Sequence, residues 1–207
     1  MPYKIKEIFT SIQGEGLFAG RIMNFIRFSG CNLDCRWCDT DHEGGEEKTL
    51  AEIMETVDGK MKWVSLTGGE PLLQKGLEEL IKELKARGHN ILLETNGTLF
   101  RKGLFDSCDF ISADLKGPSS GNRGFEKKVF EYCINHPGKT QLKIVLQNKK
   151  DFNFFKSIYK SYPNWILQPE WTTIHQIDYL AWLQELSPEI RADIRFIPQI
   201  HKVLEVE

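Results

Sequence analysis

The sequence lacks any long apolar run and any marked excess of one charge. No stretch of its 207 residues approaches the roughly 18 consecutive apolar positions of a membrane helix, so we expect no membrane partner. Lysines and arginines number 27 against 29 aspartates and glutamates, which gives a formal net charge of -2. This balance argues against nucleic acid as a partner, because such binding normally requires a basic surface. The N-terminus has no signal-peptide-like apolar segment, and we expect a cytoplasmic protein.

Cysteines are also few, and their distribution excludes a secreted disulfide framework. The chain has five, an odd number, and Cys31, Cys35 and Cys38 lie within eight residues of one another. A disulfide-stabilised secreted domain would be shorter and would carry an even set. Cys108 and Cys133 are isolated, and we expect them to be ordinary buried residues. The clustering of the other three indicates metal chemistry in a reducing compartment.

What the sequence does contain is an alternation of short apolar runs and amphipathic segments. Such alternation predicts βαβ units with right-handed crossovers and a parallel sheet. The units are too few for a full eight-fold barrel. We therefore predict an α/β fold, a partial, open parallel βα barrel of about six strands, in a single domain of residues 1–207. The strand-like runs are Met23–Phe28, Trp63–Leu66, Ile91–Leu93, Phe110–Ala113, Leu142–Leu146, Trp165–Leu167 and Ile194–Ile197. The helix-like segments are Thr49–Val57, Leu72–Arg87, Phe125–Ile134, Phe152–Tyr159 and Ile174–Leu186. The predicted loops are Asp39–Lys48 and Gly117–Gly124.

The three clustered cysteines follow the first predicted strand with the spacing C-x3-C-x2-C. Thiolates are the usual ligands of iron–sulfur clusters. Three of them in one loop can hold three corners of a 4Fe–4S cubane and leave the fourth iron open to a substrate or cofactor. The alternative is a zinc-stabilised binding module, in which His42 completes a site with the three cysteines. Structural zinc ligands usually come as two separated pairs, which favours the cluster.

Polar residues and glycines stand at the ends of the next strands. Thr67-Gly68-Gly69-Glu70-Pro71 contains paired glycines, which let the backbone approach a ligand closely. Glu94-Thr95-Asn96-Gly97 ends the next apolar run; a plain turn is the alternative for its last two residues, but a carboxylate there needs a partner. Ser112, Asp114 and Lys116 share one face of the following strand, and we predict that they line a cavity if that face turns inward. Gln168, at a later strand end, is a further candidate.

This set of motifs resembles the radical S-adenosylmethionine superfamily. In that superfamily the open iron of the cluster binds S-adenosylmethionine, and one-electron reduction cleaves it to a 5′-deoxyadenosyl radical. The resemblance implies that Cys31, Cys35 and Cys38 bind the 4Fe–4S cluster and are catalytic. It also implies contacts with S-adenosylmethionine from Gly68, Gly69, Glu70, Glu94, Ser112, Asp114 and Lys116.

The N-terminal segment narrows the resemblance to one family. Ser11-Ile12-Gln13-Gly14-Glu15-Gly16, Arg27, Cys38-Asp39-Thr40 and Pro198-Gln199-Ile200-His201-Lys202 together closely resemble 7-carboxy-7-deazaguanine synthases. The resemblance implies a lyase that contracts the ring of 6-carboxy-5,6,7,8-tetrahydropterin to 7-carboxy-7-deazaguanine with loss of ammonia, for queuosine and related 7-deazapurines. It further implies Mg²⁺, a homodimer and a flavodoxin-like reductant.

The same resemblance assigns the substrate and magnesium contacts. Arg27 offers a bidentate fork to a carboxylate, Glu15 can accept from guanidine-like N–H groups, and a hydroxyl such as that of Thr40 suits Mg²⁺. The alternatives are a surface salt bridge for Arg27, a solvated charge for Glu15 and a turn residue for Thr40. The implied substrate-binding residues are Ile12, Gln13, Gly14, Glu15, Arg27 and Thr67, and the implied magnesium ligand is Thr40.

A glycyl-radical activase is the main alternative within the superfamily. It would share the cluster and the fold, but its substrate would be a glycine of another protein. The Gln-Gly-Glu-Gly segment and Arg27 favour a small carboxylated substrate instead.

Overall fold

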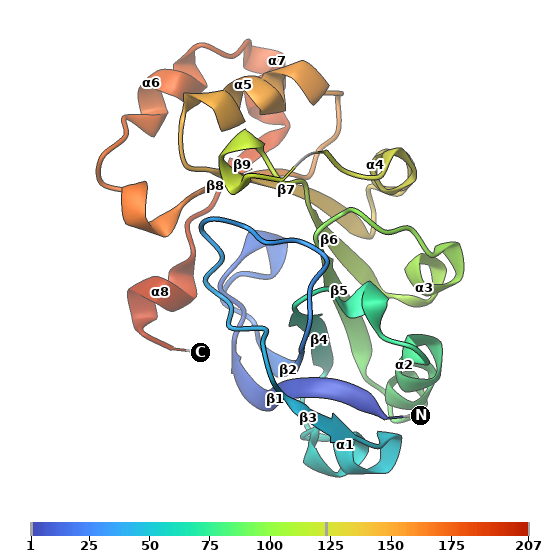
Figure 1. The fold of residues 1–207 in the computed structure, drawn as a ribbon. Helices are drawn as coiled ribbons and strands as arrows, with labels where there is room; N and C mark the ends of the chain where they lie inside the picture. The colour runs from blue at the N-terminus through green and yellow to red at the C-terminus, as the bar shows by residue number, and fades with distance from the viewer. Residues whose placement is uncertain (1, 123, 207) are drawn as a thin grey trace.

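The computed structural model describes residues 2–122 and 124–206, and one curved sheet forms its scaffold (Figure 1). In these residues nine strands pair in the order β3-β1-β2-β4-β5-β6-β7-β8-β9. From β2 to β9 all neighbours are parallel, whereas β1 runs antiparallel to both β2 and β3. The predicted open parallel barrel is confirmed. The strands are β1 Tyr3–Ile12, β2 Ile22–Phe28, β3 Glu46–Lys48, β4 Trp63–Gly68, β5 Asn90–Thr95, β6 Phe110–Asp114, β7 Thr140–Leu146, β8 Trp165–Pro169 and β9 Ile194–Phe196.

Two strands, β1 and β3, were not predicted. Each of the seven apolar runs became a parallel strand, but β1 mixes polar and apolar residues and buries only Tyr3 and Ile5. The three residues of β3, Glu-Glu-Lys, are all polar and lie in the predicted loop 39–48; they join the sheet edge through backbone pairing with β1. The other predicted loop, Gly117–Gly124, contains one turn of 3-10 helix, and its Arg123 lies outside the described residues.

Among the described residues, five helices overlap the predicted segments, whereas Lys102–Ser107, Pro188–Ala192 and Ile200–Leu204 form helices that were not predicted. Thr49 and Glu52 form the expected capping box at the start of α1. The predicted helix Leu72–Arg87 is divided, because Gly76 has φ 76° and α2 begins only after it. None of the described helices is long and apolar enough to cross a membrane. The helices are α1 Leu50–Thr56, α2 Leu77–Ala86, α3 Lys102–Ser107, α4 Lys127–Asn135, α5 Lys149–Ile158, α6 Tyr179–Gln184, α7 Pro188–Ala192 and α8 Ile200–Leu204, with 3-10 turns η1 Gly16–Phe18, η2 Pro71–Leu73, η3 Pro118–Ser120 and η4 Trp171–Thr173.

Side chains alternate between the two faces of the sheet, and this alternation places the site. One face carries the main apolar core, which includes Ile26 and Leu66. The other face carries a small apolar cluster of Met23, Phe25, Leu92 and Phe110. On this second face, the side chains nearer the carboxyl ends of the strands are polar. The polar residues there are Arg27, Thr67, Glu94, Ser112, Asp114, Lys143 and Gln168.

Candidate active site

A cavity of about 790 Å³ lies at the carboxyl ends of the parallel strands. This is the edge at which parallel barrels gather their functional loops. The cavity is lined by nearly every residue that the sequence singled out. These are Ile12, Gln13, Gly14, Glu15, Arg27, Cys31, Cys35, Cys38, Thr40, His42, Thr67, Gly68, Gly69, Glu94, Asn96, Ser112, Asp114, Lys116 and Gln168.

Paired glycines bring the end of β4 against the loop that carries the cysteines. The backbone N–H of Gly69 donates to the carbonyl of Phe28 at 2.9 Å, and that of Glu70 donates to the carbonyl of Gly30 at 2.9 Å. A Cβ on Gly69 would lie 1.8 Å from the Gly30 oxygen, and one on Gly68 would lie 2.4 Å from the Phe28 oxygen. A side chain at Gly69 would therefore displace the cysteine loop, and one at Gly68 would displace the end of β2 that leads into it.

Two amide side chains donate to the sulfur atoms of that loop. Asn96 Nδ2 lies 3.7 Å from Cys31 Sγ, and Asn122 Nδ2 lies 3.2 Å from Cys35 Sγ. Burial raises the pKa of the Cys35 thiol to about 11. In residues 2–122 and 124–206, no group of three His, Cys, Asp or Glu side chains converges on a single ion. A cubane does not require such convergence, because each thiolate binds a different iron, and N–H donors to sulfur suit it.

Glu70 is placed differently from the prediction. Its side chain is fully buried, and the residue is absent from the cavity lining. The carboxylate accepts from the backbone N–H of Asn96 at 2.8 Å, from that of Leu72 at 3.0 Å and from the Thr95 hydroxyl at 2.9 Å. Burial raises the pKa of this carboxyl despite these donors. Glu70 therefore fixes the loop after β5, and through it Asn96, rather than pointing a carboxylate at a cofactor.

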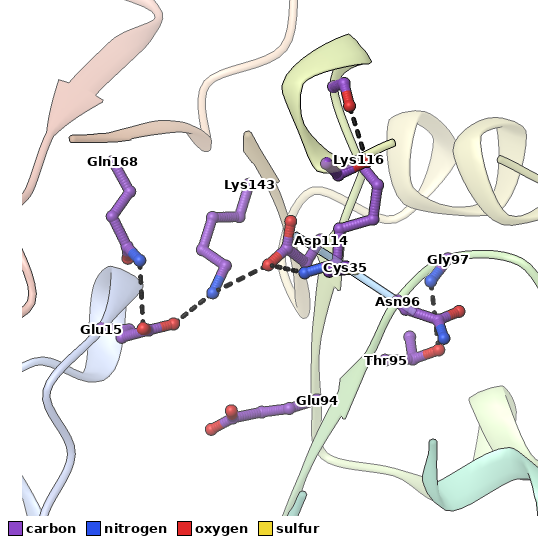
Figure 2. Close-up of polar contacts among 12 residues, drawn as sticks. Glu15, Cys35, Glu94, Thr95, Asn96, Gly97, Asp114, Lys116, Lys143 and Gln168 are labelled. Atoms are coloured by element: carbon purple, nitrogen blue, oxygen red, sulfur yellow. Dashed lines mark hydrogen bonds and ion pairs between the residues drawn. The ribbon is translucent and has the colours of Figure 1, made fainter. Parts of the chain in front are cut away.

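A row of alternating charges crosses the cavity floor (Figure 2). Asp114 and Lys143 are neighbours in the register of β6 and β7, and Lys143 Nζ lies 3.2 Å from Asp114 Oδ2. The same oxygen lies 3.0 Å from Lys116 Nζ, and Lys143 also forms an ion pair with Glu15. Burial alone would lower the pKa of Lys143, but the charges of Asp114 and Glu15 raise it well above its usual range. Lys143 therefore stays charged although it is only 7% exposed.

Glu15 is the end of this row and is held by side chains from distant segments. Its Oε1 accepts from Gln168 Nε2 at 3.0 Å and from Gln199 Nε2 at 2.7 Å. Burial would raise the pKa of Glu15, but the Lys143 ammonium and the Gln199 amide lower it overall. Glu15 is thus a fixed, ionised acceptor, and the alternative of a solvated loop charge is wrong. Lys143 and Gln199 were not predicted; the one available signal was a lysine inside the apolar run Leu142–Leu146.

Glu94 stands at the end of an apolar strand, and its carboxylate has the hydrogen-bond donors that a buried charge requires there. It accepts from Gln13 Nε2 at 2.5 Å, from the Ser65 hydroxyl at 2.9 Å and from the Thr67 hydroxyl at 3.1 Å. Burial, followed by the negative charge of Glu15, raises its pKa. Gln13 and Thr67 belong to the predicted substrate contacts, whereas Glu94 belongs to the predicted cofactor contacts. The two predicted groups therefore meet at this carboxylate.

Arg27 lines the cavity while it makes contacts of its own. It forms an ion pair with Glu7, the residue opposite it on β1, and its guanidinium lies 4.9 Å from the centre of the Phe9 ring. The salt bridge that was considered as an alternative is therefore present. It is compatible with a ligand contact, because a guanidinium carries five N–H donors.

The C-terminal segment closes one side of the cavity, where α8 lies beside the N-terminal loop (Figure 1). The backbone N–H of Ile200 donates to the Gly14 carbonyl at 3.0 Å, and a Cβ on Gly14 would lie 1.8 Å from His201 Nδ1. Lys202 Nζ lies 3.1 Å from Asp39 Oδ2, which places this segment next to Thr40. Burial lowers the pKa of His201.

Comparison with known proteins places the chain in a family. The model of the Radical SAM superfamily matches residues 25–129. The 7-carboxy-7-deazaguanine synthase of Thermoplasma acidophilum is 36% identical, over 97% of this chain and 96% of the relative. The corresponding protein of Archaeoglobus fulgidus is 36% identical over 97% of both chains, and that of Methanopyrus kandleri is 34% identical over 97% and 93%. The chain belongs to the 7-carboxy-7-deazaguanine synthase family.

Solved structures agree with this assignment at the level of the fold. QueE from Escherichia coli superposes with a TM-score of 0.72 at 22% identity, over 96% of this chain and 94% of that one. Members of the radical S-adenosylmethionine superfamily use a 4Fe–4S cluster and S-adenosylmethionine, and the cysteine loop fits both. Family membership therefore favours the cluster over the zinc alternative, and the named relatives favour a synthase over an activase.

Proposed function

We propose that this protein contracts the ring of 6-carboxy-5,6,7,8-tetrahydropterin to 7-carboxy-7-deazaguanine and releases ammonia. This is a carbon–nitrogen lyase reaction on the route to queuosine and related 7-deazapurines. The observation that carries the proposal is one cavity in which the cysteine loop faces a preformed set of acceptors and a guanidinium, in a chain 36% identical to a named synthase.

The cofactor side of the cavity would be formed by the cysteine loop and the ends of β4 to β6. When bound there, the cluster and S-adenosylmethionine would supply the radical chemistry that the ring contraction requires. Cys31, Cys35 and Cys38 would hold the cluster. The backbone of Gly68 and Gly69, together with the side chains of Glu94, Ser112, Asp114 and Lys116, would orient S-adenosylmethionine. Asp114 Oδ1 supports this role, because it is buried and has no hydrogen-bond donor among the described residues.

The substrate side would be formed by the N-terminal loop and the inward face of β2. Arg27 would bind the pterin carboxylate through its guanidinium. Glu15, kept ionised by Lys143, would accept from the guanidine-like edge of the pterin, while Gln13, Thr67 and the backbone of Ile12 and Gly14 would complete the polar contacts.

Thr40 is our proposed magnesium ligand, because hydroxyl and carboxylate oxygens suit this ion and Asp39 lies beside it. We propose a flavodoxin-like reductant in the cytoplasm; it would approach the cysteine loop from the side of Cys38, which is exposed. A homodimer is proposed as well; Val203 and Leu204 of α8 are 61% and 52% exposed, which is consistent with a covered surface in the assembly.

Anaerobic turnover tests the proposal. Reconstituted protein, reduced in the presence of S-adenosylmethionine and magnesium, should convert 6-carboxytetrahydropterin to the ring-contracted product, identified by mass spectrometry. Absence of this product from protein with a full cluster would contradict the proposal. Appearance of a glycyl radical on an added protein partner would instead support the activase.

A further inference from the structure

A side-chain amide from outside the cysteine loop lies against one of the three proposed cluster ligands. Asn122 Nδ2 is 3.2 Å from Cys35 Sγ, although 87 positions separate the two residues in the sequence. The same nitrogen donates to the Ser120 carbonyl at 3.3 Å. Because a carbonyl oxygen can only accept, this second contact fixes the orientation of the amide. The sulfur atom of Cys35 therefore faces the N–H group of Asn122 and not its oxygen.

The turn that carries Asn122, residues 117–122, is held in place by the body of the protein. The backbone N–H of Ser119 donates to Asp151 Oδ1 at 2.9 Å, and Asp151 is fully buried in the first turn of α5. The hydroxyl of Ser120 donates to the Gly117 carbonyl at 2.7 Å and accepts from the backbone N–H of Asn122 at 3.1 Å. These contacts set the position of Asn122 without any help from the cysteine loop.

The cysteine loop is joined to the same turn immediately after Cys35. The backbone N–H of Arg36 donates to the Ser120 carbonyl at 3.0 Å, and Trp37 Nε1 donates to the Ser119 hydroxyl at 3.0 Å. Both contacts come from the two residues that follow Cys35. They fix the backbone that carries the sulfur against the turn that carries the donor, so the amide and the sulfur stay in register.

The contact from Asn122 is also the shortest N–H contact to a sulfur atom among residues 2–122 and 124–206. Cys31 Sγ accepts from the backbone N–H of Leu33 at 3.4 Å and from Asn96 Nδ2 at 3.7 Å. Asn122 lies closer to its sulfur, at 3.2 Å. Its influence on the electron density at a sulfur ligand should therefore exceed that of either contact to Cys31.

A donor at this place acts on the charge of the cluster. When the cluster takes up one electron from an external reductant, it gains one negative charge, which its sulfur ligands share. An N–H group interacts more strongly with the more negative form, and hydrogen bonds to the sulfur ligands are among the factors that set the reduction potential of iron–sulfur clusters.

We propose that Asn122 is a positioning residue that acts through Cys35 and raises the reduction potential of the cluster. The inference rests on the cluster ligands given under the proposed function, but it does not depend on the pterin reaction. Asn122 would thereby make the reduced cluster easier to reach for a weak biological reductant.

A redox titration of the anaerobically reconstituted protein, without S-adenosylmethionine or pterin, tests this inference. Asn122→Leu removes the N–H donor at similar size, and electron paramagnetic resonance follows the reduced cluster. At a given solution potential, the ratio of reduced to oxidised cluster should fall by about three- to tenfold, which is a midpoint lower by about 30–60 mV for one electron. Iron content and thermal unfolding should match wild type. Asn153→Leu, at an exposed position of α5, is the matched control and should leave the midpoint unchanged.

The outcomes separate this inference from the proposed function. An unchanged midpoint in Asn122→Leu with full iron, or an equal shift in Asn153→Leu, would overturn the inference and leave the proposed function intact. Wild-type protein that binds no iron would overturn both together. If Asn122→Leu loses iron, Asn122→Ala gives the same comparison, because it removes the amide without adding bulk. Loss of iron from both variants would mean that Asn122 holds the cysteine loop, and a role in setting the potential would be wrong.

Discussion

The two sides of the cavity are built in different ways. The cofactor side is built around one short loop: Gly68 and Gly69 let the backbone of β4 approach this loop closely, and the side chain of Asn96 donates to one of its cysteines. The substrate side depends on contacts between side chains far apart in the sequence, such as Glu15 with Lys143 and with Gln199, separated by 128 and 184 residues. A short motif therefore identifies the first side, whereas only the completed sheet assembles the second.

The largest expected effect is on the cofactor side. Cys35→Ala should abolish both the cluster and the activity, because no other described side chain takes its position in the loop. Iron content and the visible spectrum of the anaerobic protein measure this directly. Cys108→Ala, in a buried cysteine far from the loop in sequence, should keep its iron; a loss of iron in both variants, or in neither, would contradict the assignment.

Lys143→Met should damage the substrate side most. It would leave Glu15 and Asp114 buried without their shared counter-ion, a change that typically costs about 3–5 kcal/mol of unfolding free energy. Denaturant titration measures that cost, with the exposed Lys156→Met as control. If the comparison between the two sides is correct, folded Lys143→Met still binds iron but loses affinity for the pterin. Equal loss of iron and pterin binding would show that the sides are not separable.

Glu70→Gln tests the role assigned to a carboxylate that the sequence placed on the cofactor. The amide would keep one acceptor oxygen but would turn its NH2 group toward the backbone N–H of either Asn96 or Leu72, which costs about 1–3 kcal/mol. We expect a less stable protein that loses its cluster faster. Glu55→Gln, on the exposed side of α1, is the control. If Glu70→Gln is as stable as wild type but binds S-adenosylmethionine more weakly, Glu70 contacts the cofactor directly and the structural role given to it here is wrong.

The smallest effect is a pH dependence on the substrate side. The pKa of Glu15 is lowered in the folded protein from an ordinary value of 4.5. Its contribution to stability is therefore fully present above pH 4.5 and is lost as the pH falls through the folded pKa; each pKa unit of difference is worth about 1.4 kcal/mol. The difference in unfolding free energy between wild type and Glu15→Gln should shrink as the pH is lowered below 4.5. A difference that stays constant or grows would contradict the ion pair with Lys143.

The apolar runs were enough to predict the parallel strands, because buried parallel strands need continuous apolar residues. They could not predict β1, whose polar positions are half-buried, or β3, which joins the edge through its backbone. In the site, the clustered cysteines and the paired glycines can be recognised from short stretches of the sequence, and both groups line the cavity. The roles of Lys143 and Gln199 could not be read from their surroundings in the sequence, because their contacts with Glu15 depend on which strands and termini the fold brings together.

The central claim is that both sides of the cavity act on one substrate. A single anaerobic reaction tests it most directly, by comparing the amount of product with the amount of S-adenosylmethionine supplied. With the reduced cluster, excess 6-carboxytetrahydropterin and a limiting amount of S-adenosylmethionine, we predict several equivalents of 7-carboxy-7-deazaguanine and ammonia per S-adenosylmethionine, which is regenerated. Cleavage of S-adenosylmethionine to 5′-deoxyadenosine with no ring-contracted product would contradict the account.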